Sequence, residues 1–281
     1  MMVQTAFENE PHFVMTMKDH TDFCAQMARA YGNDRFEKLD PLDEMVHLVS
    51  KHDCGWDFYD ADPGLDPDTG LPFTMIRTPT PYAMKTNSGS PDYNESVSAY
   101  SGLLSSMHTW GLYNKRYGHS RFVVPTRSGV SITLKPEFEQ MKQDMLQGEL
   151  NRQARLKEVL LQDEKTAALV ADKHLFQNYK QLQFFDTMAL YFNMIHAGER
   201  GDELYIHVPV SAEEDSDVML RKIDEATYTL DPFPFNVDKL KLVAHGKYMK
   251  PLPAGTQISG GLGKTLSQIA DDRQEYLLMP A

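Results

Sequence analysis

Residues 172–196 read DKHLFQNYKQLQFFDTMALYFNMIH, and this stretch decides how we expect the chain to fold. Five of its residues share one stripe of a helix through their i, i+4 and i+3 spacing: Leu175, Tyr179, Leu182, Asp186 and Ala189. The remaining positions are apolar almost all round, which indicates a helix buried inside the protein. A buried carboxylate is costly unless it is paired, hydrogen-bonded or bound to a metal. Asp186 therefore needs a partner in the core.

Histidines lie on the apolar faces of three other expected helices. The spacing of apolar residues predicts helices over residues 19–31, 41–52 and 95–111. Their inward-facing histidines are, in order, His20, His52 and His108. Imidazole with carboxylate suits Fe, Mn, Zn, Ni or Co, so three inward histidines and one buried aspartate favour a shared divalent metal. Spacing alone leaves a second reading open, in which each side chain is satisfied separately in the core.

The pair His52-Asp53 stands at the expected end of the second helix. Neighbouring helical side chains diverge by about 100°, so both can reach one ion only if it lies beside the helix end. Lys51 could contact a phosphate there, or it could be a solvated cation at a helix C-terminus. Asp57 is a candidate general base, although an acidic residue also suits a solvated turn.

The rest of the chain predicts a mainly α protein. Residues 57–95 are rich in Pro and Gly and are expected to form a long loop or lid. A short hairpin is expected within 121–134 and helices over 136–171. After Gly201 the segments alternate or are rich in β-formers. We thus expect a helical core over residues 1–200 and, over 201–281, a small antiparallel β-rich extension packed on that core.

Composition limits the partners and the compartment. The net charge of the 281-residue chain is -12 and no Lys/Arg run is present, so neither nucleic acid nor a membrane is an expected partner. The two cysteines cannot form a disulfide framework and suggest a reducing compartment. The first residues do not read as a signal peptide, so the expected location is cytoplasmic. Cys24 lies on an apolar stripe and is interpreted as a core residue. The oligomeric state stays open, and a homo-oligomer is one possibility.

Four segments together resemble a known family. They are the helix of His20 with Ala25 and Ala28, the stretch HDCGWDFYDADPGLDPDTGLP (52–72), His108 within SSMHTWG, and LQFFDTMALYF (182–192). They resemble DUF3891, a bacterial family of unknown function, over roughly residues 12–250. The order His, His-Asp and a distant Asp is also similar to the HD superfamily of metal-dependent phosphohydrolases. That likeness implies an HD-domain-like helical core in which His20, His52, Asp53 and Asp186 bind the metal, with His108 as an added ligand.

The resemblance implies a metal-dependent phosphohydrolase acting on a small phosphorylated molecule. Lys51, Asp53 and Asp57 are the candidate catalytic residues. One alternative is a di-iron oxygenase of the HD type, which would need both His108 and His119 inside the site. Another is a non-catalytic metal-binding or regulatory protein that keeps the fold.

Overall fold

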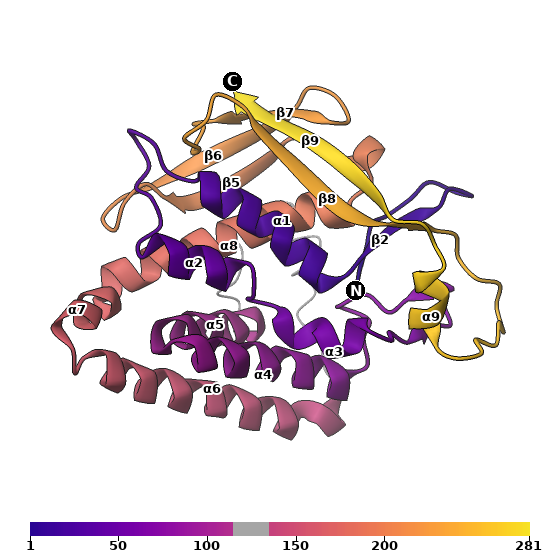
Figure 1. Ribbon diagram of the computed structural model, residues 1–281, viewed down its shortest axis with the longest axis horizontal. Helices are drawn as coiled ribbons and strands as arrows, with labels where there is room; N and C mark the ends of the chain where they lie inside the picture. The colour runs from indigo at the N-terminus through magenta and orange to yellow at the C-terminus, as the bar shows by residue number, and fades with distance from the viewer. Residues whose placement is uncertain (115–134) are drawn as a thin grey trace.

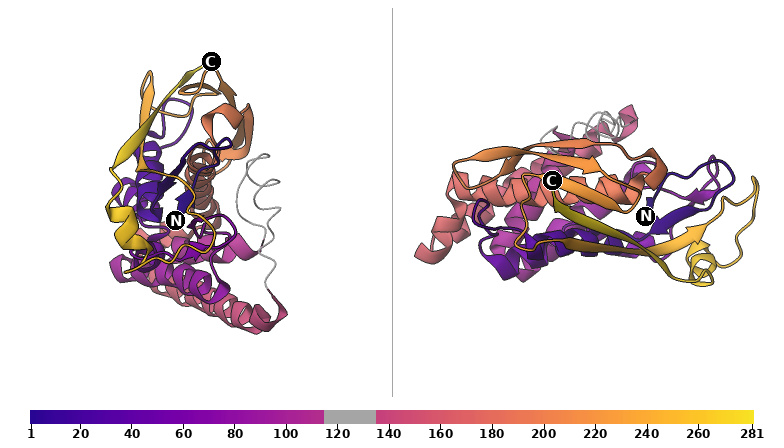
Figure 2. Two further views of the ribbon diagram at one scale, coloured as in Figure 1. Left: turned by 90° about the vertical axis from the view of Figure 1, so that its right-hand side faces the viewer. Right: turned by 90° about the horizontal axis from the view of Figure 1, so that it is seen from above.

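The helices and strands are arranged in three layers (Figure 1). The computed structural model describes residues 1–114 and 135–281. Two helices, α1 (Met17–Ala30) and α8 (Asp172–Met194), pack on each other in the middle layer. A sheet covers one side of this pair and further helices cover the other, an order that the rotated views also show (Figure 2).

The outer helical layer is built around α5 (Ala99–Tyr113). Helices α4 (Thr80–Val97) and α6 (Glu139–Leu160) pack on α5, and α5 in turn contacts α8. The short helix α2 (Leu42–Val49) joins the layers because it contacts α1, α5 and α8. After the turn that follows α2, the single turn η1 (Cys54–Trp56) packs against α4.

The sheet has seven strands in the order β1-β2-β8-β9-β7-β6-β5. Their bounds are β1 Met2–Val3, β2 His12–Met15, β5 Glu203–Pro209, β6 Asp215–Lys222, β7 Thr227–Asp231, β8 Leu240–Met249 and β9 Asp272–Pro280. Only the β7–β9 pair is parallel among these neighbours. The expected mainly α fold with a small C-terminal sheet is therefore wrong: the structure is about 48% helix and 20% strand, with a large curled sheet.

The sheet was underestimated for two physical reasons. Strands β1 and β2 have two and four residues, too few to show an alternating pattern. They join the sheet through a very distant partner, since His12 pairs with Met249 of β8. Strand β6 is mostly polar and half-exposed, so its sequence lacks the apolar signal of a buried strand. The sheet consequently takes strands from both sides of position 200.

The helices expected over 19–31 and 172–196 are confirmed as α1 and α8. Those expected over 41–52 and 95–111 are shorter, because α2 ends at Val49, before His52, and α5 begins only at Ala99. The expected loop over 57–95 is more ordered than predicted. That stretch holds α3 (Asp57–Asp60), a two-stranded ribbon of β3 (Leu65–Asp66) and β4 (Leu71–Pro72), and most of α4. The helices expected over 136–171 are confirmed as η3 (Pro136–Phe138), α6, α7 (Glu164–Ala167) and η4 (Ala168–Val170). The hairpin expected within 121–134 lies outside the described residues.

Helix α4 contains one of the prolines of the stretch that was expected to be a loop. Pro91 lies inside α4 and has no N–H to donate to the carbonyl of Asn87, one turn earlier. The hydroxyl of Thr109 on α5 donates to that carbonyl at 3.1 Å instead. A tertiary contact thus satisfies the group that proline leaves without a helical partner.

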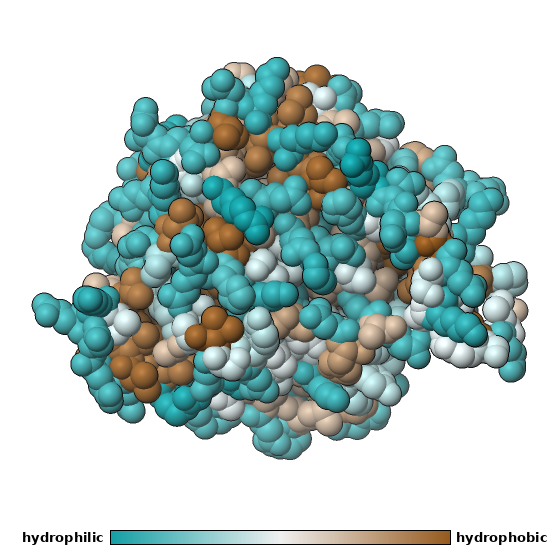
Figure 3. All heavy atoms as spheres, in the orientation of Figure 1, coloured by the Kyte–Doolittle hydropathy of each residue, from teal (hydrophilic) through white to brown (hydrophobic). Residues whose placement is uncertain are grey.

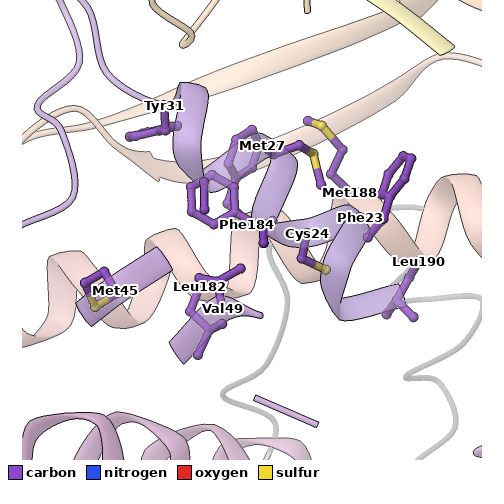
Figure 4. Packing of buried hydrophobic residues seen from close by; sticks show 14 of the residues in the cluster. Phe23, Cys24, Met27, Tyr31, Met45, Val49, Leu182, Phe184, Met188 and Leu190 are labelled. Atoms are coloured by element: carbon purple, nitrogen blue, oxygen red, sulfur yellow. The ribbon is translucent and has the colours of Figure 1, made fainter. Parts of the chain in front are cut away.

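The core lies between the middle helices and their neighbours. Side chains of α1, α2 and α8 interlock there, among them Phe23, Met45 and Phe184 (Figure 4). The face drawn in Figure 3 is largely hydrophilic, with hydrophobic side chains in small separate groups. Within residues 1–114 and 135–281, every helix is too short or too polar to cross a membrane.

Two glycines give a matched test of the packing around η1. A Cβ at Gly55 would lie 2.0 Å from the carbonyl oxygen of Thr86 in α4, whereas a Cβ at Gly148 in α6 would meet nothing within 4 Å. We expect Gly55→Ala to destabilise the protein by about 1–3 kcal/mol through overpacking. Gly148→Ala should stabilise it by about 0.5–1 kcal/mol. Urea denaturation of both variants measures this, and a Gly55→Ala protein as stable as wild type would contradict the packing.

Candidate metal centre

Five side chains converge where α1, α5 and α8 meet the segment that follows α2. His20 comes from α1, His108 from α5 and Asp186 from α8. His52 and Asp53 follow the end of α2 at Val49, within the turn that leads into η1. His20, His52, His108 and Asp186 are buried, and Asp53 is the most exposed of the five with 14% of its side chain accessible. The structure thus brings together the five residues that the sequence predicts as ligands.

Asp186 lies at the centre of this group. Its Oδ1 is 2.9 Å from Nε2 of His20. Its Oδ2 is 3.8 Å from Nε2 of His52 and 3.8 Å from Nε2 of His108. Asp53 approaches the same nitrogen of His52, with 3.7 Å between Oδ2 and Nε2. Ligands held about 2.1 Å from one ion are themselves about 3.0–3.5 Å apart, so these separations are close to those of a coordinated set.

His52 presents an unpartnered nitrogen to the two carboxylates. Its Nδ1 lies 2.7 Å from the carbonyl oxygen of Val49, the last residue of α2, and donates a hydrogen bond to it. No hydrogen-bond partner for Nε2 exists in the described part of the chain, although that atom is fully buried. Histidine ligands of metals commonly donate their second ring nitrogen to a backbone carbonyl. The hydrogen bond to Val49 therefore directs Nε2 of His52 toward the two carboxylates, where the nitrogen could bind a metal that replaces its proton.

The orientation of His20 depends on Asn193, two turns beyond Asp186 on α8. The side-chain nitrogen of Asn193 is 3.0 Å from Nδ1 of His20, while its Oδ1 has no partner within the described residues. Rotation of the carboxamide by 180° exchanges the two atoms. Nδ1–H of His20 would then donate to Oδ1 of Asn193, and Nε2 would be free to bind an ion. Both orientations keep His20 directed at Asp186.

Charged neighbours oppose the effect of burial on the pKa values of His52 and Asp186. Burial lowers the pKa of His52, but the charge of Asp53 and contact with Asp186 outweigh it and raise the pKa to about 9. Burial favours the neutral form of Asp186, yet His20 and His52 hold its pKa well below the usual range. Burial and the charge of His52 lower the pKa of His108. Without a metal, a proton on His52 thus offsets part of the charge of two carboxylates.

Donor atoms that lie within 4.8 Å of one another define two groups that could hold a metal ion. One contains His20, Cys24, His52 and Asp186, and the other His52, Asp53 and His108. Cys24 was interpreted from the sequence as a core residue, and Asn193 was not singled out. Helical spacing carried a signal for both, because Cys24 is one turn from His20 and Asn193 is two turns from Asp186.

Two candidate catalytic residues lie outside both donor groups. Asp57 is exposed on α3, where burial raises its pKa and the charge of Lys51 lowers it. Lys51 is half-buried, and its backbone carbonyl accepts a hydrogen bond from Asn94 at 3.0 Å. His119 lies outside the described residues.

Comparison with known proteins shows the family of the chain. A family model described as "Protein of unknown function (DUF3891)" matches residues 1–250. The chain belongs to the DUF3891 family. No curated protein and no solved structure matches it. Membership of DUF3891 confirms the resemblance drawn from residues 52–72 and 182–192, and it assigns no reaction. The HD-domain-like character of this DUF3891 protein stays a prediction.

The pKa of His52 predicts how the stability of the metal-free protein changes with pH. The folded value of about 9 lies above the value of about 6.5 of an unfolded histidine. The stabilising contribution of His52 is therefore fully present below about pH 6.5 and lost as the pH rises through 9. Urea midpoints of chelator-treated protein should fall over this interval, and they should fall less in His52→Gln. A wild-type midpoint that rises between pH 6.5 and 9 would be inconsistent with a protonated His52.

Proposed function

We propose that the protein binds a divalent metal ion through His20, His52, Asp53, His108 and Asp186 and acts as a metal-dependent phosphohydrolase. The observation that carries the proposal is the buried Nε2 of His52, which faces two carboxylates and has no hydrogen-bond partner among the described residues. An isolated acceptor in such a place is costly unless a cation or a proton occupies it.

The donor set supports an ion of the first transition series. Three imidazoles and two carboxylates suit Fe, Mn, Zn, Ni or Co. The calcium ion, by contrast, prefers a shell made of oxygen atoms alone. Asp53 and Asp186 supply two negative charges, which a divalent cation would neutralise in place of the proton on His52. Metal binding should therefore release a proton.

Hydrolysis of a phosphoester is the reaction that these residues support best. A divalent ion held there would polarise a phosphoryl oxygen and lower the pKa of a bound water. Asp53 contacts His52 and is the most exposed of the five proposed ligands. It is therefore the group best placed to meet both the substrate and the ion. Lys51 precedes His52 and would add a positive charge for a phosphate. The proposed substrate is a small phosphorylated molecule.

Removing the central carboxylate tests the metal site. Asp186→Asn keeps the size of the side chain but removes the charge that faces three histidines, so we expect it to lose bound metal. The matched control is Asp144→Asn, which changes an exposed aspartate on α6 and should retain metal. Elemental analysis after dialysis against a weak chelator gives the metal per chain. Equal metal content in Asp186→Asn and wild type would remove the basis of the proposal.

Turnover of a panel of small phosphoesters tests the hydrolase. We expect metal-loaded wild type to release phosphate and Asp53→Ala to lose this activity together with most of its metal. Two bound irons per chain with oxygen-sensitive absorbance would instead support an oxygenase. Bound metal without turnover over the whole panel would support a non-catalytic role.

A further inference from the structure

Cys24 lies beside the metal centre rather than only within the apolar core. It follows His20 by four residues on α1, so both side chains point from the same face of the helix. Neither residue is accessible to solvent. The sulfur of Cys24 is 3.8 Å from Nε2 of His20, the same nitrogen that meets Asp186.

These separations suit a shared ion. A zinc ion binds sulfur at about 2.3 Å and imidazole nitrogen at about 2.0–2.1 Å, which places the two donors about 3.6 Å apart at a tetrahedral angle. Donor atoms of His20, Cys24, His52 and Asp186 all lie within 4.8 Å of one another. The group also contains the buried Nε2 of His52, which independently requires a cation or a proton.

A cysteine that only fills space in the core would account for fewer of these distances between donor atoms. Cys24 does pack against the core between α1 and α8, as Figure 4 shows, and a thiol is well accommodated there. Helical spacing already brings the sulfur near His20, but it does not account for donor atoms of His52 and Asp186, which come from other segments, within 4.8 Å of it. Cys54 provides the contrast, because it is half-buried and belongs to neither donor group.

We propose that Cys24 supplies a sulfur ligand to the metal centre, which therefore takes a thiophilic ion such as zinc, cobalt(II) or iron(II) in a mixed nitrogen, oxygen and sulfur set. The inference rests on the proposed metal site and extends it to the class of ion. Thiolate ligands select zinc and iron over manganese and magnesium. On binding, the thiol proton is released and the sulfur lone pair forms the bond to the ion, with no change in oxidation state.

Cobalt(II) substitution distinguishes a sulfur ligand from a neighbouring thiol. The protein is stripped with a chelator and titrated with cobalt(II) under nitrogen, in wild type, Cys54→Ser and Cys24→Ser. A cobalt–thiolate bond gives a charge-transfer band in the near ultraviolet, whereas nitrogen and oxygen ligands give only the weaker visible bands. We expect the ultraviolet band in wild type and in Cys54→Ser, and its loss in Cys24→Ser with cobalt still bound.

The possible results distinguish a failure of the proposed sulfur ligand from a failure of the proposed metal site. Cobalt bound to Cys54→Ser without the ultraviolet band would overturn the sulfur ligand and leave the metal site standing. A band that persists in Cys24→Ser would overturn it too. No cobalt bound to wild type would contradict both the site and the ligand. Because Cys54→Ser retains Cys24 as the one cysteine of the chain, its spectrum decides the question even if Cys24→Ser does not fold.

Discussion

The burial of one carboxylate constrains the helical part of this structure. Asp186 lies in the middle of α8, a helix whose residues are nearly all buried after its first turn. Its two oxygens meet histidines from three other segments, and the contact with His20 is a hydrogen bond of 2.9 Å. Since an unpaired carboxylate would cost several kcal/mol in such surroundings, α1, α5 and the segment after α2 are held around it.

The sheet and the outer helices fix the positions from which these side chains reach Asp186. The side chain of Gln26 on α1 makes two hydrogen bonds with the backbone of Val243 in β8, each 2.9 Å long, and so attaches the helix of His20 to the sheet. On the opposite side, Asn94 of α4 donates to the carbonyl of Lys51 and to the hydroxyl of Ser105. The turn that carries His52 is thereby tied to two outer helices.

Sequence periodicity could predict the helices and which faces of them are buried. Residues 172–196, for example, form α8 because their apolar pattern is unambiguous. It could not predict the sheet, in which β1 and β2 join the other strands because His12 pairs with Met249 across most of the chain. Periodicity likewise shows that His20 and Cys24 share a face without showing that the sulfur faces donors. Helical spacing places Asn193 on the same face as Asp186, but it does not encode the distance of 3.0 Å to His20 on which the role of Asn193 depends.

The number of negatively charged ligands decides the net charge of the loaded site. That charge in turn affects how strongly the site attracts an anionic substrate. With Asp53 and Asp186 as the only anions, a divalent ion leaves the ligand set neutral, which suits the approach of an anionic phosphoester. A thiolate from Cys24 makes the loaded set carry one negative charge, and phosphate is then attracted less strongly at short range. A neighbouring cation would have to compensate, and Lys51, the residue directly before His52, is the nearest in sequence. A sulfur ligand would thus make the proposed hydrolysis of phosphoesters more dependent on Lys51 than a set of oxygen and nitrogen ligands would.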